Sequence, residues 1–151
     1  NILSTHRNWL SRIPKRCILT PHLGELERLI GKCMDTYERL TKVKELAAYL
    51  QSYIIVKGAW TCIVTPEGNY YFNPTGNPGM ATGGSGDVLT GILLGLLAQG
   101  YEREDACRLG VYVHGLAGNL AAEEKTEIGM TANDIVEALP KAWKTLTTKN
   151  S

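Results

Sequence analysis

The chain has 151 residues, which is enough for one domain with a core of its own. Its 16 Lys and Arg residues nearly balance its 15 Asp and Glu residues, which argues against binding nucleic acid or a membrane surface through a basic field. Hydrophobic residues make up 44% and charged residues 21%, the usage of a folded protein rather than a disordered one. The longest apolar stretch, 88–98, is too short for a membrane helix, which needs about 20 residues.

The first half of the chain alternates between two periodicities. Leu23, Leu26, Leu29 and Ile30 recur at helical spacing, as do the apolar residues of 36–50. Short runs rich in apolar and β-branched residues predict strands between and after these helices. The predicted strands are 16–20, 53–58, 61–65 and 70–73, with a turn at 66–69, and the predicted helices are 23–30 and 36–50.

The second half predicts helices only. Residues 88–99 are apolar on all sides, which predicts a central helix buried all round. A helix over about 103–122 keeps Gly110, Gly115 and Gly118, although each glycine costs about 1 kcal/mol relative to Ala, so we expect close packing against a neighbour. Thr131 and Asp134 form a capping box for a last helix, which Pro140 should kink or restart. Strands that alternate with helices define an α/β fold.

A glycine-rich segment precedes the apolar helix. Gly83, Gly84 and Gly86 surround Ser85, and their backbone N–H groups can approach a ligand closely because glycine has no Cβ. The first turn of a helix has unpaired N–H groups and a partial positive charge, so the segment predicts an anion site, typically for phosphate. No Lys-Ser/Thr pair follows the last glycine, and the spacing is not G-x-G-x-x-G, so neither a Walker A loop nor a Rossmann fingerprint is present.

Asp87 follows the glycines directly. A carboxylate repels phosphate, so its place here needs a reason. One interpretation is a base that takes a proton from a substrate hydroxyl during phosphoryl transfer. The other is a plain helix N-cap, a position that Asp favours.

Three motifs together resemble one known family. Residues 77–91 read NPGMATGGSGDVLTG, 19–25 read LTPHLGE and 56–61 read VKGAWT. In order and spacing these are similar to the motifs of the ATP/ADP-dependent NAD(P)H-hydrate dehydratases of the ribokinase-like superfamily. The resemblance implies a three-layer α/β/α sandwich with a central, mostly parallel sheet. It also implies a repair reaction, in which ATP or ADP with Mg²⁺ phosphorylates the ring hydroxyl of the S-form of hydrated NADH or NADPH, and elimination restores the cofactor.

The resemblance also assigns roles to residues. Asp87 is the catalytic base and contacts the hydrate together with His22. Glu25 organises magnesium through water, with no direct metal ligand. The residues that contact the nucleotide are Lys57, Gly58, Ala59, Trp60, Thr61, Asn77, Gly83, Gly84, Ser85 and Gly86. Each role has a plainer alternative: His22 as a helix cap, Lys57 as a solvated charge, and Trp60 as packing rather than a stack on adenine. His114 is taken as structural.

The family's catalytic domain extends further at its N-terminus, so residues 1–151 are expected to form its C-terminal part, with the N-terminal part absent. We expect this part alone to be inactive or nearly so, and to self-associate through an open sheet edge. The parent protein is expected to be cytoplasmic, since the four cysteines are far apart and form no Cys-x-x-Cys pair, which predicts reduced and mostly buried thiols. A fused NAD(P)H-hydrate epimerase domain is a further expectation. Two other functions stay open: a ribokinase-like kinase of a sugar or hydroxymethylpyrimidine, and a non-catalytic nucleotide-binding module.

Overall fold

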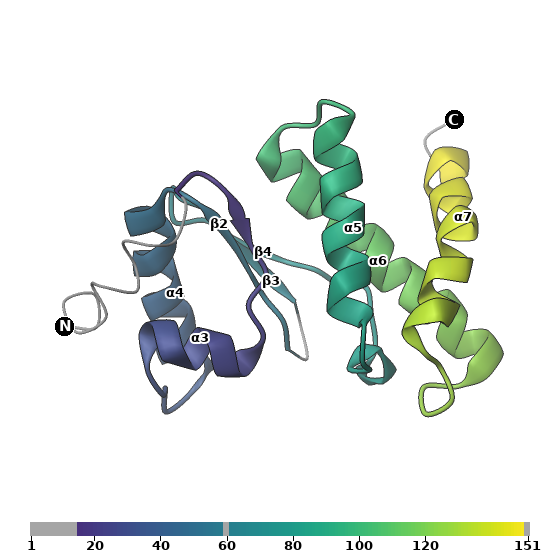
Figure 1. Ribbon diagram of the computed structural model, residues 1–151, viewed down its shortest axis with the longest axis horizontal. Coiled ribbons are helices and arrows are strands. Elements are labelled where there is room, and N and C mark those ends of the chain that lie inside the picture. Colours follow the sequence, from purple (N-terminus) through teal and green to yellow (C-terminus); the bar gives the residue numbers. More distant parts are fainter. Residues whose placement is uncertain (1–14, 59–60, 150–151) are drawn as a thin grey trace. The chain divides into compact units, whose positions relative to one another are not determined.

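The computed structural model describes residues 15–58 and 61–149, with side chains up to 147 (Figure 1). The chain divides into two compact units, Asn1–Phe72 and Asn73–Ser151. We call them the sheet unit and the helical unit, and each is described by itself.

The sheet unit contains a four-stranded sheet in the order β1-β2-β3-β4. The strands are β1 (Ile18–Leu19), β2 (Tyr53–Val56), β3 (Cys62–Val64) and β4 (Tyr70–Phe72). Strand β1 pairs with β2 in parallel, whereas the β2·β3 and β3·β4 pairs are antiparallel. The prediction of a mostly parallel sheet is therefore wrong for the described strands. The reason is connection length: only β1 and β2 are joined by a helical crossover, and short links such as the turn at 66–69 permit antiparallel pairs.

Helices α3 (Leu23–Ile30) and α4 (Thr36–Leu50) pack on one face of this sheet (Figure 1). The helical spacing predicted both helices, and the bounds are confirmed. The core between helices and sheet is made of buried apolar side chains: Leu26, Ile30, Val43, Leu46, Ala47, Leu50, Ile54, Val56, Cys62 and Val64. The strands are shorter than predicted, because β1 keeps only two residues of 16–20 and β2 ends two residues before Gly58.

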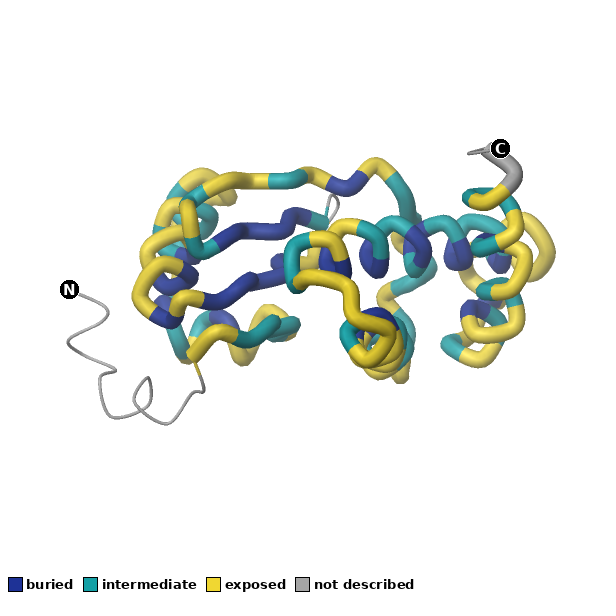
Figure 2. Tube along the Cα trace, turned by 90° about the horizontal axis from the view of Figure 1, so that it is seen from above, coloured by how far each residue is buried: buried dark blue, intermediate teal, exposed yellow. Residues whose placement is uncertain are grey.

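The helical unit contains a short 3₁₀ turn and three helices. They are η1 (Pro78–Met80), α5 (Ser85–Ala98), α6 (Arg103–Lys125) and α7 (Ala132–Lys149). Helix α6 packs against both α5 and α7 (Figure 1), and buried residues recur along much of its length (Figure 2). The core that α6 and α7 share comprises Val113, Ala117, Ala121, Met130, Ile135 and Ala142.

Helix α5 corrects the expectation of a helix buried on all sides. It buries a single stripe, Ser85, Leu89, Leu93 and Leu96, while Leu94 is 62% exposed. Although α5 has apolar residues on all sides, only one side of this helix is buried in this chain. The helix also begins three residues earlier than predicted, at Ser85, so that Asp87 lies inside its first turn.

The glycines of α6 pack closely, as predicted. A Cβ on Gly110 would lie 2.8 Å from Leu93 Cδ2, and a Cβ on Gly115 or Gly118 would overlap Thr75 or Met80. These glycines therefore let α5 and the segment before it approach α6.

The capping box of the last helix is confirmed. The Thr131 N–H donates to Asp134 Oδ2 at 2.8 Å, and the Asp134 N–H donates to Thr131 Oγ1 at 3.3 Å. The predicted restart at Pro140 is wrong, since α7 continues through it. Pro140 and Val136 are both exposed, so water can reach the Val136 carbonyl that lacks the helical N–H partner.

All four cysteines are free thiols. Cys62 and Cys107 are buried, and Cys17 and Cys33 are half-buried, so the expectation of mostly buried thiols is half right. Burial raises the pKa of Cys62 to about 11 and that of Cys107 to about 12, so both are neutral near pH 7. In the part of the chain that the structure describes, no helix combines the length and apolar character needed to cross a membrane.

Candidate functional site

The glycine segment ends in a helix start that presents unpaired donors. Gly84 is the N-cap of α5 in the left-handed conformation, with φ 89° and ψ −11°. The Ser85 N–H donates to the Thr82 carbonyl at 3.2 Å, closing a turn in front of the helix. Within residues 15–58 and 61–149, no backbone carbonyl accepts a hydrogen bond from the N–H of Gly86 or Asp87. Free N–H groups at the positive end of a helix favour an anion such as phosphate.

Asp87 is the third residue of α5 and is exposed. The N-cap position belongs to Gly84, and no side chain caps this helix. The alternative interpretation of Asp87 as a plain N-cap is therefore wrong. Its carboxylate lies in the first turn, where the helix dipole stabilises a negative charge.

The glycines of this segment differ in what surrounds them. A Cβ on Gly84 would lie 3.2 Å from the Ala132 Cβ, and the positive φ of Gly84 itself favours glycine. A Cβ on Gly83 would meet no atom within 4 Å, so the space beside it is open. Gly84 thus shapes the backbone, while the open space at Gly83 leaves room for a ligand.

The segment before the glycines is bonded to α6. The Thr75 hydroxyl donates to the Tyr112 carbonyl at 3.0 Å, and Asn77 Nδ2 donates to Asn119 Oδ1 at 3.0 Å. Asn77 Oδ1 also accepts from the Gly79 N–H at 3.0 Å. The side chain predicted to contact a nucleotide therefore holds η1 against α6, a role that the sequence motif did not indicate.

Ser85 is bonded to α6 as well. The residue is 7% exposed, and its Oγ lies 3.3 Å from His114 Nε2. The Ser85 N–H already bonds the Thr82 carbonyl, so the N–H and the hydroxyl of Ser85 both have partners inside the helical unit. Sequence reasoning missed this pair, because the two residues lie 29 positions apart and no motif joins them.

His22 is the N-cap of α3, so its plainer alternative as a helix cap is confirmed. His22 Nδ1 accepts from the Glu25 N–H at 3.2 Å, and the His22 N–H donates to Glu25 Oε1 at 3.0 Å, which completes a capping box. The same Glu25 oxygen lies 3.3 Å from His22 Nε2. An accepting Nδ1 leaves the ring proton on Nε2 in the neutral imidazole.

The ring of His22 fits beside a glycine. A Cβ on Gly24 would lie 3.2 Å from His22 Cε1 and 3.3 Å from its Nδ1. The glycine of the LTPHLGE motif thus leaves room for the ring of its histidine. The His22 side chain is 67% exposed, so its edge remains open to a ligand.

The remaining predicted residues follow the end of β2. Lys57 and Gly58 are exposed directly after the strand, and Thr61 is half-buried before β3. Ala59 and Trp60 lie outside the described residues. Because β1 and β2 are parallel, His22 and Lys57 both follow the carboxyl end of their strand, and the structure brings them to the same edge of the sheet.

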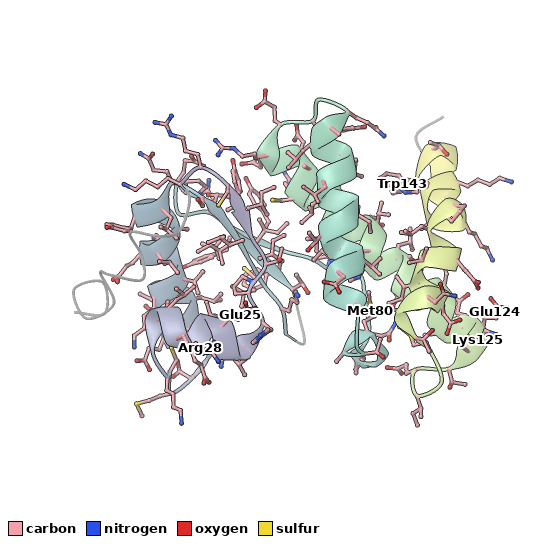
Figure 3. The ribbon with its side chains drawn as sticks, viewed as in Figure 1. Glu25, Arg28, Met80, Glu124, Lys125 and Trp143 are labelled. Carbon is pink, nitrogen blue, oxygen red and sulfur yellow. The ribbon has the colours of Figure 1, made fainter. Side chains whose placement is uncertain are left out.

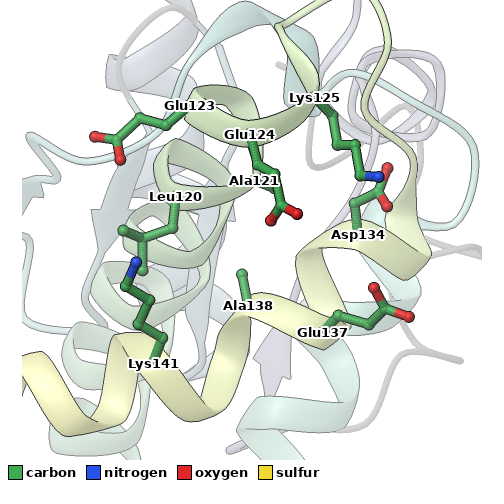
Figure 4. A pocket seen from close by; sticks show the side chains of 9 residues that line it. All are labelled: Leu120, Ala121, Glu123, Glu124, Lys125, Asp134, Glu137, Ala138 and Lys141. Carbon is green, nitrogen blue, oxygen red and sulfur yellow. The ribbon is translucent and has the colours of Figure 1, made fainter.

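Each unit has a cleft among its described residues. One, of about 410 Å³, lies beside β1 and the start of α3, and its lining includes Thr20, Pro21, Glu25 and Arg28; Figure 3 labels Glu25 and Arg28 on α3. The other, of about 360 Å³, lies between α6 and α7 and contains none of the predicted site residues (Figure 4). It is lined by Leu120, Ala121, Glu123, Glu124, Lys125, Asp134, Glu137, Ala138 and Lys141.

No cluster of three or more His, Cys, Asp or Glu side chains suited to a metal ion exists among residues 15–58 and 61–149. Magnesium in phosphoryl-transfer sites takes few protein ligands and is bound largely through phosphates and water.

The architecture and the glycine segment belong to the ribokinase-like class of α/β proteins. A solved ribokinase-like superfamily protein from Enterococcus faecalis superposes with a TM-score of 0.72 at 35% identity, over 89% of this chain and 46% of that one. An ADP/ATP-dependent NAD(P)H-hydrate dehydratase from Bacillus subtilis, co-crystallised with ATP/Mg²⁺, gives a TM-score of 0.78 at 38% identity, over 88% of this chain and 50% of that one.

Sequence comparison defines the family within this class. The profile of the NAD(P)H-hydrate dehydratases matches residues 1–141, so the chain belongs to this family. A bifunctional NAD(P)H-hydrate repair enzyme from Thermofilum pendens is 49% identical over 131 residues, which are 85% of this chain and 25% of the relative. The chain thus spans about a quarter of that relative and half of the solved B. subtilis chain.

Proposed function

We propose that the chain is the C-terminal part of an ADP/ATP-dependent dehydratase that repairs the S-form of hydrated NADH and NADPH. The observation that carries this proposal is the start of α5. It combines the free N–H groups of Gly86 and Asp87 with an exposed Asp87 carboxylate that caps nothing. An anion site and a base side by side are what phosphorylation of a hydroxyl requires.

Within this proposal the residues divide the chemistry. Asp87 takes the proton of the ring hydroxyl while the hydroxyl oxygen attacks the phosphoryl group. The N–H groups of Gly83, Gly84 and Gly86 bind the phosphoryl oxygens and stabilise the charge that develops on them, whereas the Ser85 N–H bonds the Thr82 carbonyl. A nucleotide with Mg²⁺, when bound, would supply the phosphoryl group and leave with one phosphate fewer, so that the hydroxyl becomes a phosphate ester with a good leaving group. Loss of this phosphate together with a proton from the neighbouring ring carbon would then restore the ring double bond.

The sheet unit, taken by itself, carries its own candidate ligand contacts. His22 is held by its capping box with Nε2 as a donor, which suits a hydrogen bond to an oxygen or carbonyl of the hydrate. Lys57 follows the neighbouring parallel strand and provides a positive charge for nucleotide phosphate. Glu25 takes part through water on Mg²⁺, and its other contacts fix His22.

The proposal extends to the whole protein. We infer a cytoplasmic enzyme whose catalytic domain continues beyond this chain, with an NAD(P)H-hydrate epimerase as a fused domain. The share of the matched relatives that this chain covers supports a longer catalytic domain. Strand β1 has one partner strand among the described residues, so its open edge supports self-association of the 151-residue chain.

The test replaces one carboxylate. In the longest polypeptide that carries this sequence, Asp87→Asn is expected to lower kcat for regaining NADH from the hydrate about 10²- to 10⁴-fold, with Mg-ADP affinity preserved. Asp105→Asn is the matched control, since Asp105 is the third, exposed residue of α6, and it should leave kcat unchanged. Unchanged turnover in Asp87→Asn would contradict the proposal. Net phosphorylation of a sugar would identify a kinase instead, and nucleotide binding without turnover a non-catalytic module.

A further inference from the structure

Helix α6 fixes the segment that leads into α5 at several points along one side. Thr75 bonds to the Tyr112 carbonyl and packs on Gly115, and Asn77 bonds to Asn119 one turn further on. The last of these attachments reaches α5 itself, where Ser85 meets His114. The start of α5 is thus tied to the middle of α6 by a side-chain contact.

The position of Ser85 on α5 makes this contact informative. Ser85 is the first member of the buried stripe, and the other three members are leucines. Ser85 is buried, a buried hydroxyl is costly without a hydrogen-bond partner, and His114 Nε2 lies within reach at 3.3 Å. The contact therefore favours the rotation of α5 that turns Ser85 toward α6.

That rotation also determines where Asp87 points. Each helical residue advances by 100°, so Asp87 is turned roughly 200° from Ser85 around the helix axis. With Ser85 against α6, the Asp87 carboxylate is directed away from α6 and is exposed. The unpaired N–H groups of Gly86 and Asp87 belong to the same first turn and are oriented with it.

We propose that His114 is a positioning residue, which orients the first turn of α5 through Ser85 and thereby aims the anion-binding amides and Asp87. The role of that turn rests on the proposed function. His114 touches neither substrate nor nucleotide in this scheme. It differs from a residue of the core, because its loss should change the direction of the N–H groups and not only the stability of the fold.

The test uses four variants of the longest polypeptide that carries this sequence. His114→Ala removes the partner of Ser85, and Ser85→Ala removes the hydroxyl. His114→Gln keeps an amide near the place of Nε2, and this amide can donate or accept. Leu120→Ala is the matched control, because Leu120 is a half-buried α6 residue that packs in the core shared with α7 and lines the cleft between these two helices.

Two quantities are measured: the residual dipolar couplings of the Gly86 and Asp87 N–H bonds, which report their direction, and the Kd for Mg-ADP by calorimetry. In His114→Ala and Ser85→Ala the couplings should change and the Kd should rise about three- to tenfold, the worth of one neutral hydrogen bond. His114→Gln should bring both the couplings and the Kd most of the way back to the wild-type values. Leu120→Ala should lower the unfolding temperature and leave both readouts unchanged.

Unchanged couplings in His114→Ala would overturn the proposal, as would a change of equal size in Leu120→Ala. A wild-type chain that binds no Mg-ADP, but whose couplings respond to His114→Ala and recover in His114→Gln, would support the positioning role and contradict the nucleotide site. The two proposals therefore fail in different ways.

Discussion

The two segments that carry the predicted site are held in different ways. In the sheet unit, His22 is fixed by Glu25, three residues away, through bonds that close within one helical turn. In the helical unit, Asn77 and Ser85 are fixed by α6 residues 42 and 29 positions further along the chain. The first geometry is built into its own motif, whereas the second depends on the packing of another helix. Variants that remove one kind of contact should leave the other intact.

The largest expected effect is on the long-range attachment. A Cβ on Gly115 would overlap Thr75, including its backbone carbonyl carbon at 2.7 Å, so Gly115→Ala must displace main chain. We expect it to lower the free energy of unfolding by about 2 kcal/mol, because overpacking outweighs the gain in helix propensity. Denaturant titration measures this change.

Gly95→Ala serves as the matched control on α5. A Cβ there would meet no atom within 4 Å, and Gly95 is exposed. It should therefore raise the free energy of unfolding by about 0.5–1 kcal/mol. If both variants shifted stability in the same direction, close packing on α6 would not be what fixes the segment.

Alkaline pH should lower the free energy of unfolding through one buried thiol in each unit. Cys62 in β3 and Cys107 in α6 have pKa values raised by burial from 9.0 to about 11 and about 12. Below about pH 9 these thiols are neutral in both states, so their contribution to stability is fully present. As pH rises toward 11 and 12, the unfolded chain ionises first and the contribution is lost. We expect the free energy of unfolding to fall from pH 9 upward, and less steeply in Cys62→Ala and Cys107→Ala. A slope that neither variant changes would contradict this prediction.

The expected effect on the local attachment is smaller than that on the long-range one. His22→Ala removes the N-cap of α3 and should cost about 1 kcal/mol of unfolding free energy. His22→Asn supplies another favoured cap and should retain most of that stability while it removes the imidazole. Because Asn caps but has no ring, hydrate affinity lost in His22→Asn at retained stability would separate substrate contact from capping. Equal stability loss in both variants would instead show that the ring itself matters to the fold.

Sequence reasoning succeeded where the physical cause is local. The apolar spacing of α4 gave its bounds, and the Thr131–Asp134 box gave the start of α7. It failed where distant residues decide. The direction of the sheet strands depends on which neighbours pair. The start of α5 at Ser85 was missed for a local reason instead, because the left-handed turn at Gly84 lets the helix begin before the apolar run does. The partner of Ser85 had no signal at all, since a lone histidine on a helix is compatible with many roles.

The separation along the chain between the glycine segment and its partners in α6 has a consequence for the order of events during synthesis. A chain emerging from the ribosome produces 77–87 long before Asn119, so at that stage the attachments of this segment to α6 cannot form. Since domains fold as their parts become available, the anion site should be among the last features of the helical unit to mature. A nascent chain stopped before His114 would carry the complete glycine motif and still lack the side-chain contacts to α6 that orient it.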